Sequence, residues 1–235
     1  MKYMMGVSLF LYLSVAGGWA PDQEEDGNQR FVTVSEDIQL TEEINGESIL
    51  LGVLPEDQSF LIEKEDRQHY HITFGNHTFA LPKEKGSVSE LPHQVLEDNP
   101  VSGMLVTRME GIVHEQPSGE ARQLAVISGN IRYPYLEKED SWYKVNVGGR
   151  TGYILEEKVK IDAGIPVLMY HHILPSPEQT VFRQNNMTIK VSAFREQMNY
   201  LREEGYRTIT LDDLDKYLRK ERNLPGKTVV VTFDD

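Results

Sequence analysis

The chain has 235 residues, a formal net charge of −13 and no cysteine. The negative charge argues against nucleic acid as a partner, because binding to a phosphate backbone requires a basic face. The absence of cysteine excludes disulfides, thiol catalysis and cysteine-ligated metal. Hydrophobic residues make up 39% of the chain and charged residues 26%, a balance typical of globular proteins.

The N-terminus has the layout of an export signal. Lys2 precedes an apolar run over residues 4–16, and small residues follow that run. This order predicts a signal peptide over residues 1–20 and a secreted protein. A secreted protein without cysteine suits the outside of a bacterium, where disulfides are optional. The apolar run is shorter than the roughly 20 residues of a membrane span, and the alternative is an uncleaved membrane anchor through residues 4–16. Residues 21–36 are acidic, with Gly and Asn among them, which predicts a flexible spacer.

An internal repeat organises the next part of the chain. The tetrapeptide EKED occurs at 63–66 and again at 137–140. The pattern YxIxFG at 70–75 then matches YxVxVG at 143–148. Short alternating segments without a long helical pattern surround both copies, so we predict two small β domains of related structure.

The second copy carries the clearer pattern. In WYKVNV the residues alternate between two faces, with Trp142 on one face and Tyr143 on the other. Gly148 and Gly149 suit a tight hairpin turn, and TGYIL is the expected return strand. The W-x-x-V…G-x-x-G-Y-I arrangement over about residues 104–161 resembles the bacterial SH3-like (SH3b) domain.

This resemblance implies a small all-β barrel at residues 101–162 and a degenerate copy at residues 37–100. It also implies binding to cell-wall glycan or peptidoglycan, for which Trp142, Tyr143 and Tyr153 are the candidate residues. The alternative is a structural β spacer without a ligand. No obligate protein partner is expected.

From Gly164 the pattern changes to alternating strands and helices. Apolar runs at 165–170 and 228–233 predict strands that are buried on both faces. Ser192 is the expected N-cap of a helix that stops at Gly205, and YRTIT follows as a short strand. Thr210-x-x-Asp213 has the spacing of a capping box and predicts a second helix. This succession indicates a parallel α/β domain.

Three stretches in this region, GIPVLMYHHI, FREQMNYLREEGYRTITLDDL and LPGKTVVVTFDD, resemble the start of the polysaccharide deacetylase family (NodB homology, carbohydrate esterase family 4). The resemblance implies a distorted (β/α) barrel, incomplete over residues 163–235, that follows the SH3-like barrels in a multidomain chain. It implies an exported hydrolase that removes N-acetyl groups from an N-acetylhexosamine polymer such as peptidoglycan, with the help of a divalent metal, expected to be zinc.

The same resemblance assigns roles to the two final carboxylates. Asp234 corresponds to the general base that deprotonates a water, and Asp235 to a metal ligand. His171 is a candidate for the mouth of the active site. We expect His171 and His172 to diverge, as neighbours on a strand do, and so not to share a metal.

The chain departs from the family in its histidines. The family completes its metal site with H-S/T-x-x-H downstream of the aspartates, whereas all seven histidines here lie at or before His172. We therefore expect a deacetylase truncated after its first catalytic motif, which does not hold the metal and is inactive as this chain. We also expect weak protection of residues 164–235 from amide exchange, because open parallel strands expose apolar faces. The alternative function is a non-catalytic, cell-wall-binding SH3-like protein.

Overall fold

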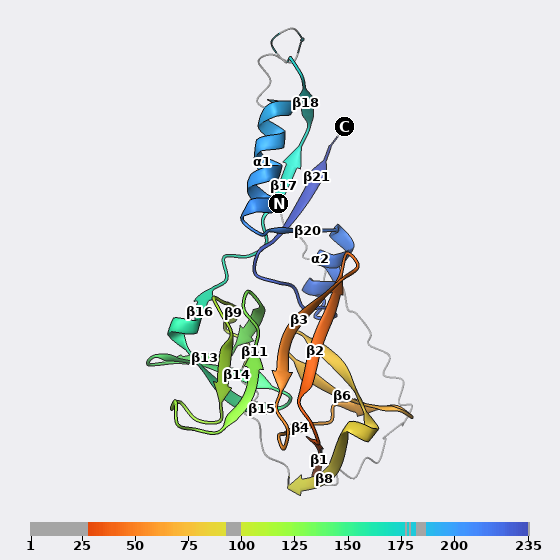
Figure 1. Cartoon of the computed structure of the whole chain (residues 1–235), viewed down its shortest axis with the longest axis vertical. Helices are drawn as coiled ribbons and strands as arrows, with labels where there is room; N and C mark the ends of the chain where they lie inside the picture. Colours follow the sequence, from red (N-terminus) through yellow and green to blue (C-terminus); the bar gives the residue numbers. More distant parts are fainter. Residues whose placement is uncertain (1–27, 93–99, 177, 179, 182–186, 235) are drawn as a thin grey trace, which may run out of the picture.

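The computed structural model describes residues 28–92, 100–176, 178, 180, 181 and 187–234. It consists of a first β unit (residues 28–92), a second β unit (residues 103–161) and an α/β segment (residues 164–234). The two β units lie side by side, and the α/β segment projects from them (Figure 1). The predicted signal peptide and the first part of the spacer lie outside the described residues.

The two β units repeat one succession of elements. The first contains β1 (Asn28–Val34), β2 (Ile38–Ile44), β3 (Glu47–Leu54), β4 (Ser59–Leu61), β5 (Lys64–Glu65), β6 (His69–Phe74), β7 (His77–Pro82), the short 3₁₀ helix η1 (Lys83–Lys85) and β8 (Gly86–Pro92). The second contains β9 (Gly103–Thr107), β10 (Gly111–His114), β11 (Gln123–Ile127), β12 (Arg132–Tyr135), β13 (Glu137–Glu139), β14 (Trp142–Val147), β15 (Arg150–Leu155), η2 (Glu156–Lys158) and β16 (Val159–Ile161). Their three-stranded sheets, β4-β1-β8 and β12-β9-β16, also correspond strand by strand.

Strand β1 corrects the predicted spacer. Residues 28–34 pair with β4 on one side and with β8 on the other, both antiparallel. Within QRFVTV the buried residues include Phe31, Val32 and Val34. The acidic residues that suggested a spacer lie mainly before residue 28, and the apolar character of β1 is enough to place it in the core.

The β units are not separate barrels. Ten of their strands form one sheet, in which β7 pairs with β6, β13 pairs with β14, and the others have the order β2-β3-β11-β10-β15-β14-β6-β5. This sheet crosses from one unit to the other at β3–β11 and at β14–β6. At the first crossing Gly52 lies so close to its neighbours that an added Cβ would lie 2.2 Å from the Val126 carbonyl oxygen. One hydrophobic core runs through both units, from Val32 to Val159. The boundary predicted near residue 100 therefore divides two repeats that fold against each other.

The α/β segment is built around a small parallel sheet. Its elements are β17 (Val167–Tyr170), β18 (His172–Leu174), β19 (Thr188–Lys190), α1 (Val191–Glu203), β20 (Arg207–Ile209), α2 (Leu211–Leu218) and β21 (Thr228–Phe233). The sheet has the order β17-β21-β20, and both pairings are parallel. This is the strand direction that the sequence predicts, while the complete barrel stays a prediction.

The helix ends test the capping predictions. The capping box at α2 is confirmed, since the Thr210 side chain accepts from Asp213 N and the Asp213 side chain accepts from Thr210 N. Gly205 follows α1 with φ of 74°, as expected of a C-terminal stop. The N-cap prediction is wrong, because α1 begins one residue before Ser192 and its N-cap is Lys190, without a side-chain cap.

The predicted burial of both strand faces is wrong for much of this sheet. Val167 and Met169 on β17 are 52% and 57% exposed, and Phe233 on β21 is 62% exposed. Only the first half of β21, Thr228–Val230, is buried. An apolar run indicates two-face burial only where a layer covers each face, and the described residues supply no second layer over β17.

No described helix is long and apolar enough to cross a membrane.

The docking loop, residues 222–227, joins the α/β segment to both β units. The Arg132 side chain of the second unit is 1% exposed and donates to the carbonyl oxygens of Pro225 and Gly226. From the loop, Asn223 donates to the Phe74 carbonyl oxygen of the first unit at 3.1 Å and accepts from the backbone of Asn76 at 2.8 Å.

A second hydrophobic core includes Leu224 of this loop. Its buried members are Ile44 from the first β unit and Ile209, Tyr217, Leu224 and Val230 from the α/β segment. The base of the α/β segment therefore completes its core with residues of the β units.

Candidate functional site

The carboxyl ends of β17 and β21 bring the candidate catalytic residues to one edge of the parallel sheet. Tyr170 pairs with Phe233 at the last position of the ladder. Beyond it, the backbone N–H of Asp234 donates to the Tyr170 carbonyl oxygen at 2.9 Å. Asp234 has left the strand and is exposed, so its carboxylate is open to water. His171 follows Tyr170, and the structure thus places it at the same edge as Asp234.

An aromatic cluster supports this edge from the side of α1. The Tyr170 ring lies 4.9 Å from Phe194 and 6.1 Å from Phe233, between centroids. The Tyr170 hydroxyl donates to Gln197 Oε1 at 2.7 Å, and burial raises the pKa of this tyrosine. Tyr170 is therefore a neutral, anchored side chain that holds the end of β17 against α1.

The expectation that the two histidines diverge is wrong. Their Nδ1 atoms are 3.1 Å apart, and their ring centroids are 4.0 Å apart. The physical reason is that His171 lies between β17 and β18 rather than inside a strand, so the alternation of strand side chains does not apply there. One of these ring nitrogens carries the hydrogen and the other accepts it.

The described residues do not fit a metal site at this edge. Asp235, the predicted ligand, lies outside them. Among residues 28–234, apart from the undescribed gaps, no three His, Cys, Asp or Glu side chains are placed to hold one ion. A catalytic zinc normally requires three protein ligands. The chemistry that these residues support on their own is proton transfer by the exposed carboxylate of Asp234.

The candidate wall-binding residues divide between the two faces of β14 and β15. Trp142 and Tyr153 are half-buried and lie on the outer face, whereas Tyr143 is 6% exposed and belongs to the core. The Tyr143 ring packs edge-on against Tyr135 at 5.1 Å. Tyr143 is thus a correction to the predicted binding set, since strand alternation turns it inward.

Sequence reasoning missed His114 on the same outer face. Its Cα is the ladder partner of Tyr153, and its ring lies 5.7 Å from that of Trp142 in an edge-to-face arrangement. The only sequence signal was its place two residues after Ile112 in a short alternating strand. That signal could not show that β10 pairs with β15.

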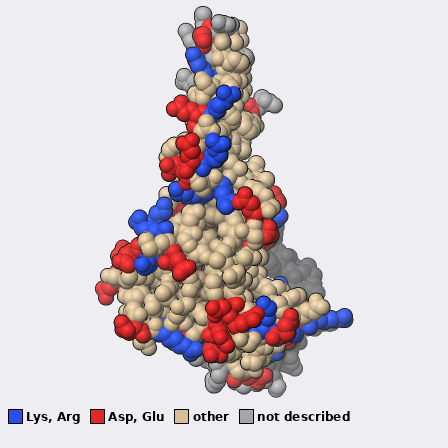
Figure 2. Space-filling model, viewed as in Figure 1, with Lys and Arg blue, Asp and Glu red and all other residues tan. Residues whose placement is uncertain are grey.

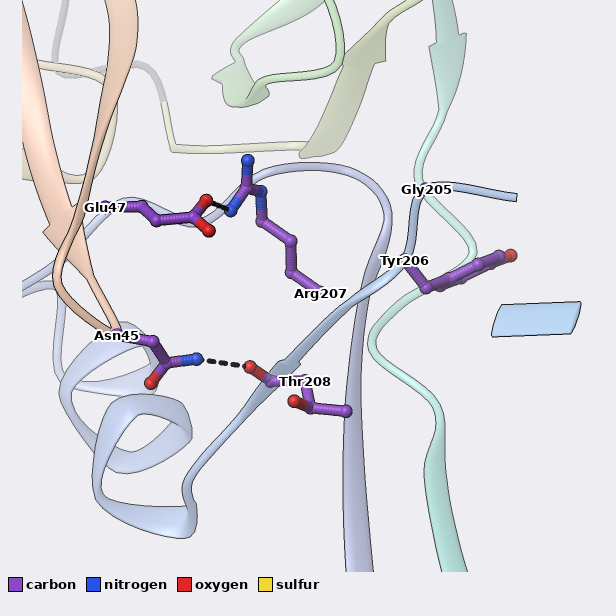
Figure 3. Close-up of a pocket in the computed structure, with 6 residues that line it drawn as sticks. All are labelled: Asn45, Glu47, Gly205, Tyr206, Arg207 and Thr208. Atoms are coloured by element: carbon purple, nitrogen blue, oxygen red, sulfur yellow. Dashed lines mark hydrogen bonds and ion pairs between the residues drawn. The ribbon is translucent and has the colours of Figure 1, made fainter. Parts of the chain in front are cut away.

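A polar pocket of about 350 Å³ lies between the tip of the β2–β3 hairpin and β20. It is lined by Asn45, Glu47, Gly205, Tyr206, Arg207 and Thr208 (Figure 3). Asn45 donates to the Thr208 carbonyl oxygen at 2.7 Å, and Arg207 pairs with Glu47. This hydrogen bond and this ion pair join β20 to the β2–β3 hairpin. The residues that line the pocket therefore attach the α/β segment to the first β unit.

Comparison with known proteins identifies one of these parts. Residues 110–160 match the family model described as bacterial SH3 domain. This stretch begins just before β10 and ends within β16, so it contains the outer face with Trp142. The second β unit is thus a bacterial SH3 domain, as its sequence predicts.

Two curated relatives are deacetylases. A poly-β-1,6-N-acetyl-D-glucosamine N-deacetylase of Escherichia coli is 35% identical over 72 residues, which cover 31% of this chain and 10% of the relative. A putative polysaccharide deacetylase of Bacillus subtilis, YxkH, is 30% identical over 78 residues, which cover 33% of this chain and 25% of the relative. The chain therefore spans a tenth to a quarter of the length of these relatives.

Solved structures resemble the chain more distantly. A polysaccharide deacetylase from Bacillus cereus matches with a TM-score of 0.26 and 17% identity, over 85% of this chain and 51% of that one. NlpC2 from Trichomonas vaginalis matches with a TM-score of 0.24 and 15% identity, over 57% of this chain and 48% of that one. Neither TM-score is high enough to support an argument about the fold.

Proposed function

We propose that this protein is a cell-wall-associated polysaccharide deacetylase of bacterial type, in which two SH3-like β units carry an α/β deacetylase segment. The proposal rests on the sequence similarity to two deacetylases and on the bacterial SH3 domain at residues 110–160. The observation that carries it is the position of Asp234. It follows the central strand of the parallel sheet at the edge that it shares with His171.

The reaction is hydrolysis of the N-acetyl amide of an N-acetylhexosamine polymer such as peptidoglycan, with release of acetate. Asp234 takes a proton from the attacking water, for which an exposed carboxylate at a strand end is suited. Asp235 is the proposed metal ligand of the intact reaction. The described residues supply no further ligand set, so we propose that this chain neither holds zinc nor turns over substrate by itself.

An acetate-release assay tests this function. The substrate is a β-linked N-acetylglucosamine hexamer with added Zn²⁺, and the proteins are the present chain and a version extended through an H-S/T-x-x-H motif, where the gene supplies one. We expect no acetate from the present chain. The extended protein should be active, and Asp234→Asn should lower its kcat by about 10²- to 10⁴-fold. Full activity of the Asp234→Asn protein would refute the role of Asp234.

A second candidate function is binding to the cell wall without catalysis. It is favoured by the outer face of β14 and β15, where the aromatic side chains of Trp142 and Tyr153 are half-exposed and do not belong to the hydrophobic core. Co-sedimentation with purified peptidoglycan measures it directly. Binding by the chain together with no acetate release from any extended version would favour this second function.

A further inference from the structure

The tip of the β2–β3 hairpin carries the only Asn-Gly pair in the sequence, Asn45-Gly46. Ile44 and Glu47 are ladder partners, so Asn45 and Gly46 form a two-residue turn between the strands. Their φ angles are 54° and 77°, and positive values at both positions are typical of a type I′ turn. Both residues are exposed, and a Cβ added at Gly46 would have no atom within 4 Å. The backbone around Gly46 is therefore unobstructed.

An Asn-Gly pair in an open turn can modify itself. The backbone nitrogen of Gly46 attacks Cγ of Asn45, so that an N–Cγ bond forms, the Cγ–Nδ2 bond breaks, and ammonia leaves with the proton of the attacking nitrogen. Water then opens the resulting succinimide ring, which leaves aspartate or isoaspartate in place of the asparagine. A Cβ on the second residue hinders this attack, and glycine is the residue without one. Water is the only other reactant.

The structure ties this reaction to the docking of the α/β segment. Asn45 Nδ2 donates to the Thr208 carbonyl oxygen of β20 at 2.7 Å, and the Asn45 side chain points toward that strand (Figure 3). Arg207, the preceding residue of β20, pairs with Glu47 on the same hairpin. While the Asn45 amide donates to Thr208, its Cγ is held at β20 and is not free to turn toward its own backbone. The rate of attack should therefore follow the population in which this contact is open.

Conversion would turn this attractive contact into a repulsive one. In aspartate an oxygen takes the place of Nδ2, and it would face the Thr208 carbonyl oxygen, so that two acceptors meet without a hydrogen between them. Arg207 cannot compensate without loss, because its partner Glu47 would compete for it. The chain already has a net charge of −13, and basic and acidic side chains are interspersed on the side shown in Figure 2. The product should therefore weaken the attachment of β20 to the hairpin.

We propose that Asn45 is a site of spontaneous deamidation, that its bond to Thr208 slows the reaction, and that the acidic product loosens the α/β segment from the first β unit. The loss of ammonia is irreversible, so this joint acquires a state that depends on the age of the molecule. The inference concerns this joint alone and does not depend on the proposed reaction at Asp234.

Peptide mapping by mass spectrometry tests the reaction. The unmodified chain and a free peptide with the sequence of residues 41–50 are incubated side by side in neutral buffer, and the conversion of Asn45 is followed over time. We expect conversion in both, at least about twofold slower in the protein, as the restraint by one hydrogen bond implies. Arg207→Met removes the neighbouring ion pair and should accelerate conversion in the protein about two- to fivefold. No conversion in the protein after the peptide has reacted fully, equal rates in protein and peptide, or an unchanged rate in Arg207→Met would overturn the proposal.

Amide exchange tests the effect of the product. Asn45→Asp introduces the aspartate directly, and aspartate tolerates the positive φ of this position. Peptides that contain β20 should exchange at least about twofold faster in Asn45→Asp than in the unmodified chain. The matched control is Asn199→Asp, the same change on α1, where Asn199 accepts from Arg202 of its own helix. Exchange at β20 that is unchanged in Asn45→Asp, or equally faster in Asn199→Asp, would contradict the proposal. Acetate release is not a readout in either test, so failure here leaves the proposed reaction at Asp234 to its own assay.

Discussion

Replacement of Arg132 by methionine should detach the α/β segment from the second β unit. Arg132 sits on β12, and its side chain is 1% exposed. Its Nε atom lies 2.7 Å from Asp162 Oδ2, and its Nη2 atom donates to the carbonyl oxygens of Gly226 at 2.8 Å and Gly164 at 3.2 Å. Nη1 donates to the carbonyl oxygen of Pro225. Methionine fills much of the same volume but provides none of these donors.

The cost is dominated by the carboxylate that remains. Asp162 has a side-chain exposure of 8%, so without Arg132 it would be a buried and unpaired charge. Removal of one partner of a buried ion pair costs about 3–5 kcal/mol. Three carbonyl oxygens also lose a donor, but their loss is not independent of the ion pair and should not be added in full. We therefore expect the free energy of unfolding of the α/β segment to fall by about 3–5 kcal/mol. Arg132→Lys keeps the charge and loses the fork of donors, so its cost should be smaller.

Amide exchange read by mass spectrometry, together with urea denaturation, measures this effect. Peptides from α2 and β21 should lose protection in Arg132→Met, while those from the β14–β15 hairpin should keep it. The matched control is Arg219→Met, because Arg219 is 65% exposed and pairs with Asp215 one helical turn away. Such a surface pair is worth about 0–1 kcal/mol. If Arg132→Met costs no more than Arg219→Met, the docking role assigned to Arg132 is wrong.

Three further predictions concern the contact between the two β units, the protonation of His77 and the binding of metal. Gly52→Ala should disrupt the contact between the β units and lower the free energy of unfolding by several kcal/mol, since the new Cβ would lie 2.2 Å from the Val126 carbonyl oxygen. In the control Gly119→Ala the new Cβ enters open space, so thermal melting should show an unchanged stability. Burial lowers the pKa of His77 below its usual 6.5, so the unfolded chain binds a proton at a higher pH than the folded one, and the free energy of unfolding should fall as the pH drops through about 6.5. The dependence of this free energy on pH should be weaker in His77→Gln. An unchanged dependence in urea titrations at several pH values would contradict this prediction. Added EDTA or Zn²⁺ should leave the unfolding midpoint of this chain unchanged, because its described residues bring no three ligands together. A midpoint that shifts with metal would contradict this expectation.

The local features of the fold could be predicted from the sequence. The alternation in WYKVNV placed Tyr143 opposite Trp142, and the structure shows the same division between core and outer face. The capping box at Thr210 and the stop at Gly205 depend on neighbouring residues only, and both occur as predicted. Ser192 failed as an N-cap because the preceding strand β19 runs directly into α1, so the first helical turn begins before it.

The long-range features could not be predicted in the same way. The sheet that joins the two β units depends on the pairing of β3 with β11, which is local to neither repeat. The LPG part of the docking loop suggested a turn, but nothing in it shows that Arg132 binds its carbonyl oxygens or that Asn223 reaches the first unit. The sequence predicts that His171 and His172 lie on one strand, but β17 ends at Tyr170, and the contact of the two rings follows from that end.

The second core changes what the β units do for the α/β segment. The sequence predicts weak protection over all of residues 164–235, because open parallel strands expose apolar faces. The structure supports weak protection for only part of this segment, because Ile209, Leu224 and Val230 are buried together with Ile44 of the first β unit. The β17 end remains as exposed as expected, with Met169 57% accessible. Because the base of β21 is fixed in this shared core and its end carries Asp234, the β units act as a platform for the candidate catalytic strand. Amide exchange should therefore find the base of β21 protected and the ends of β17 and β21 open, and uniform exchange along β21 would contradict this arrangement.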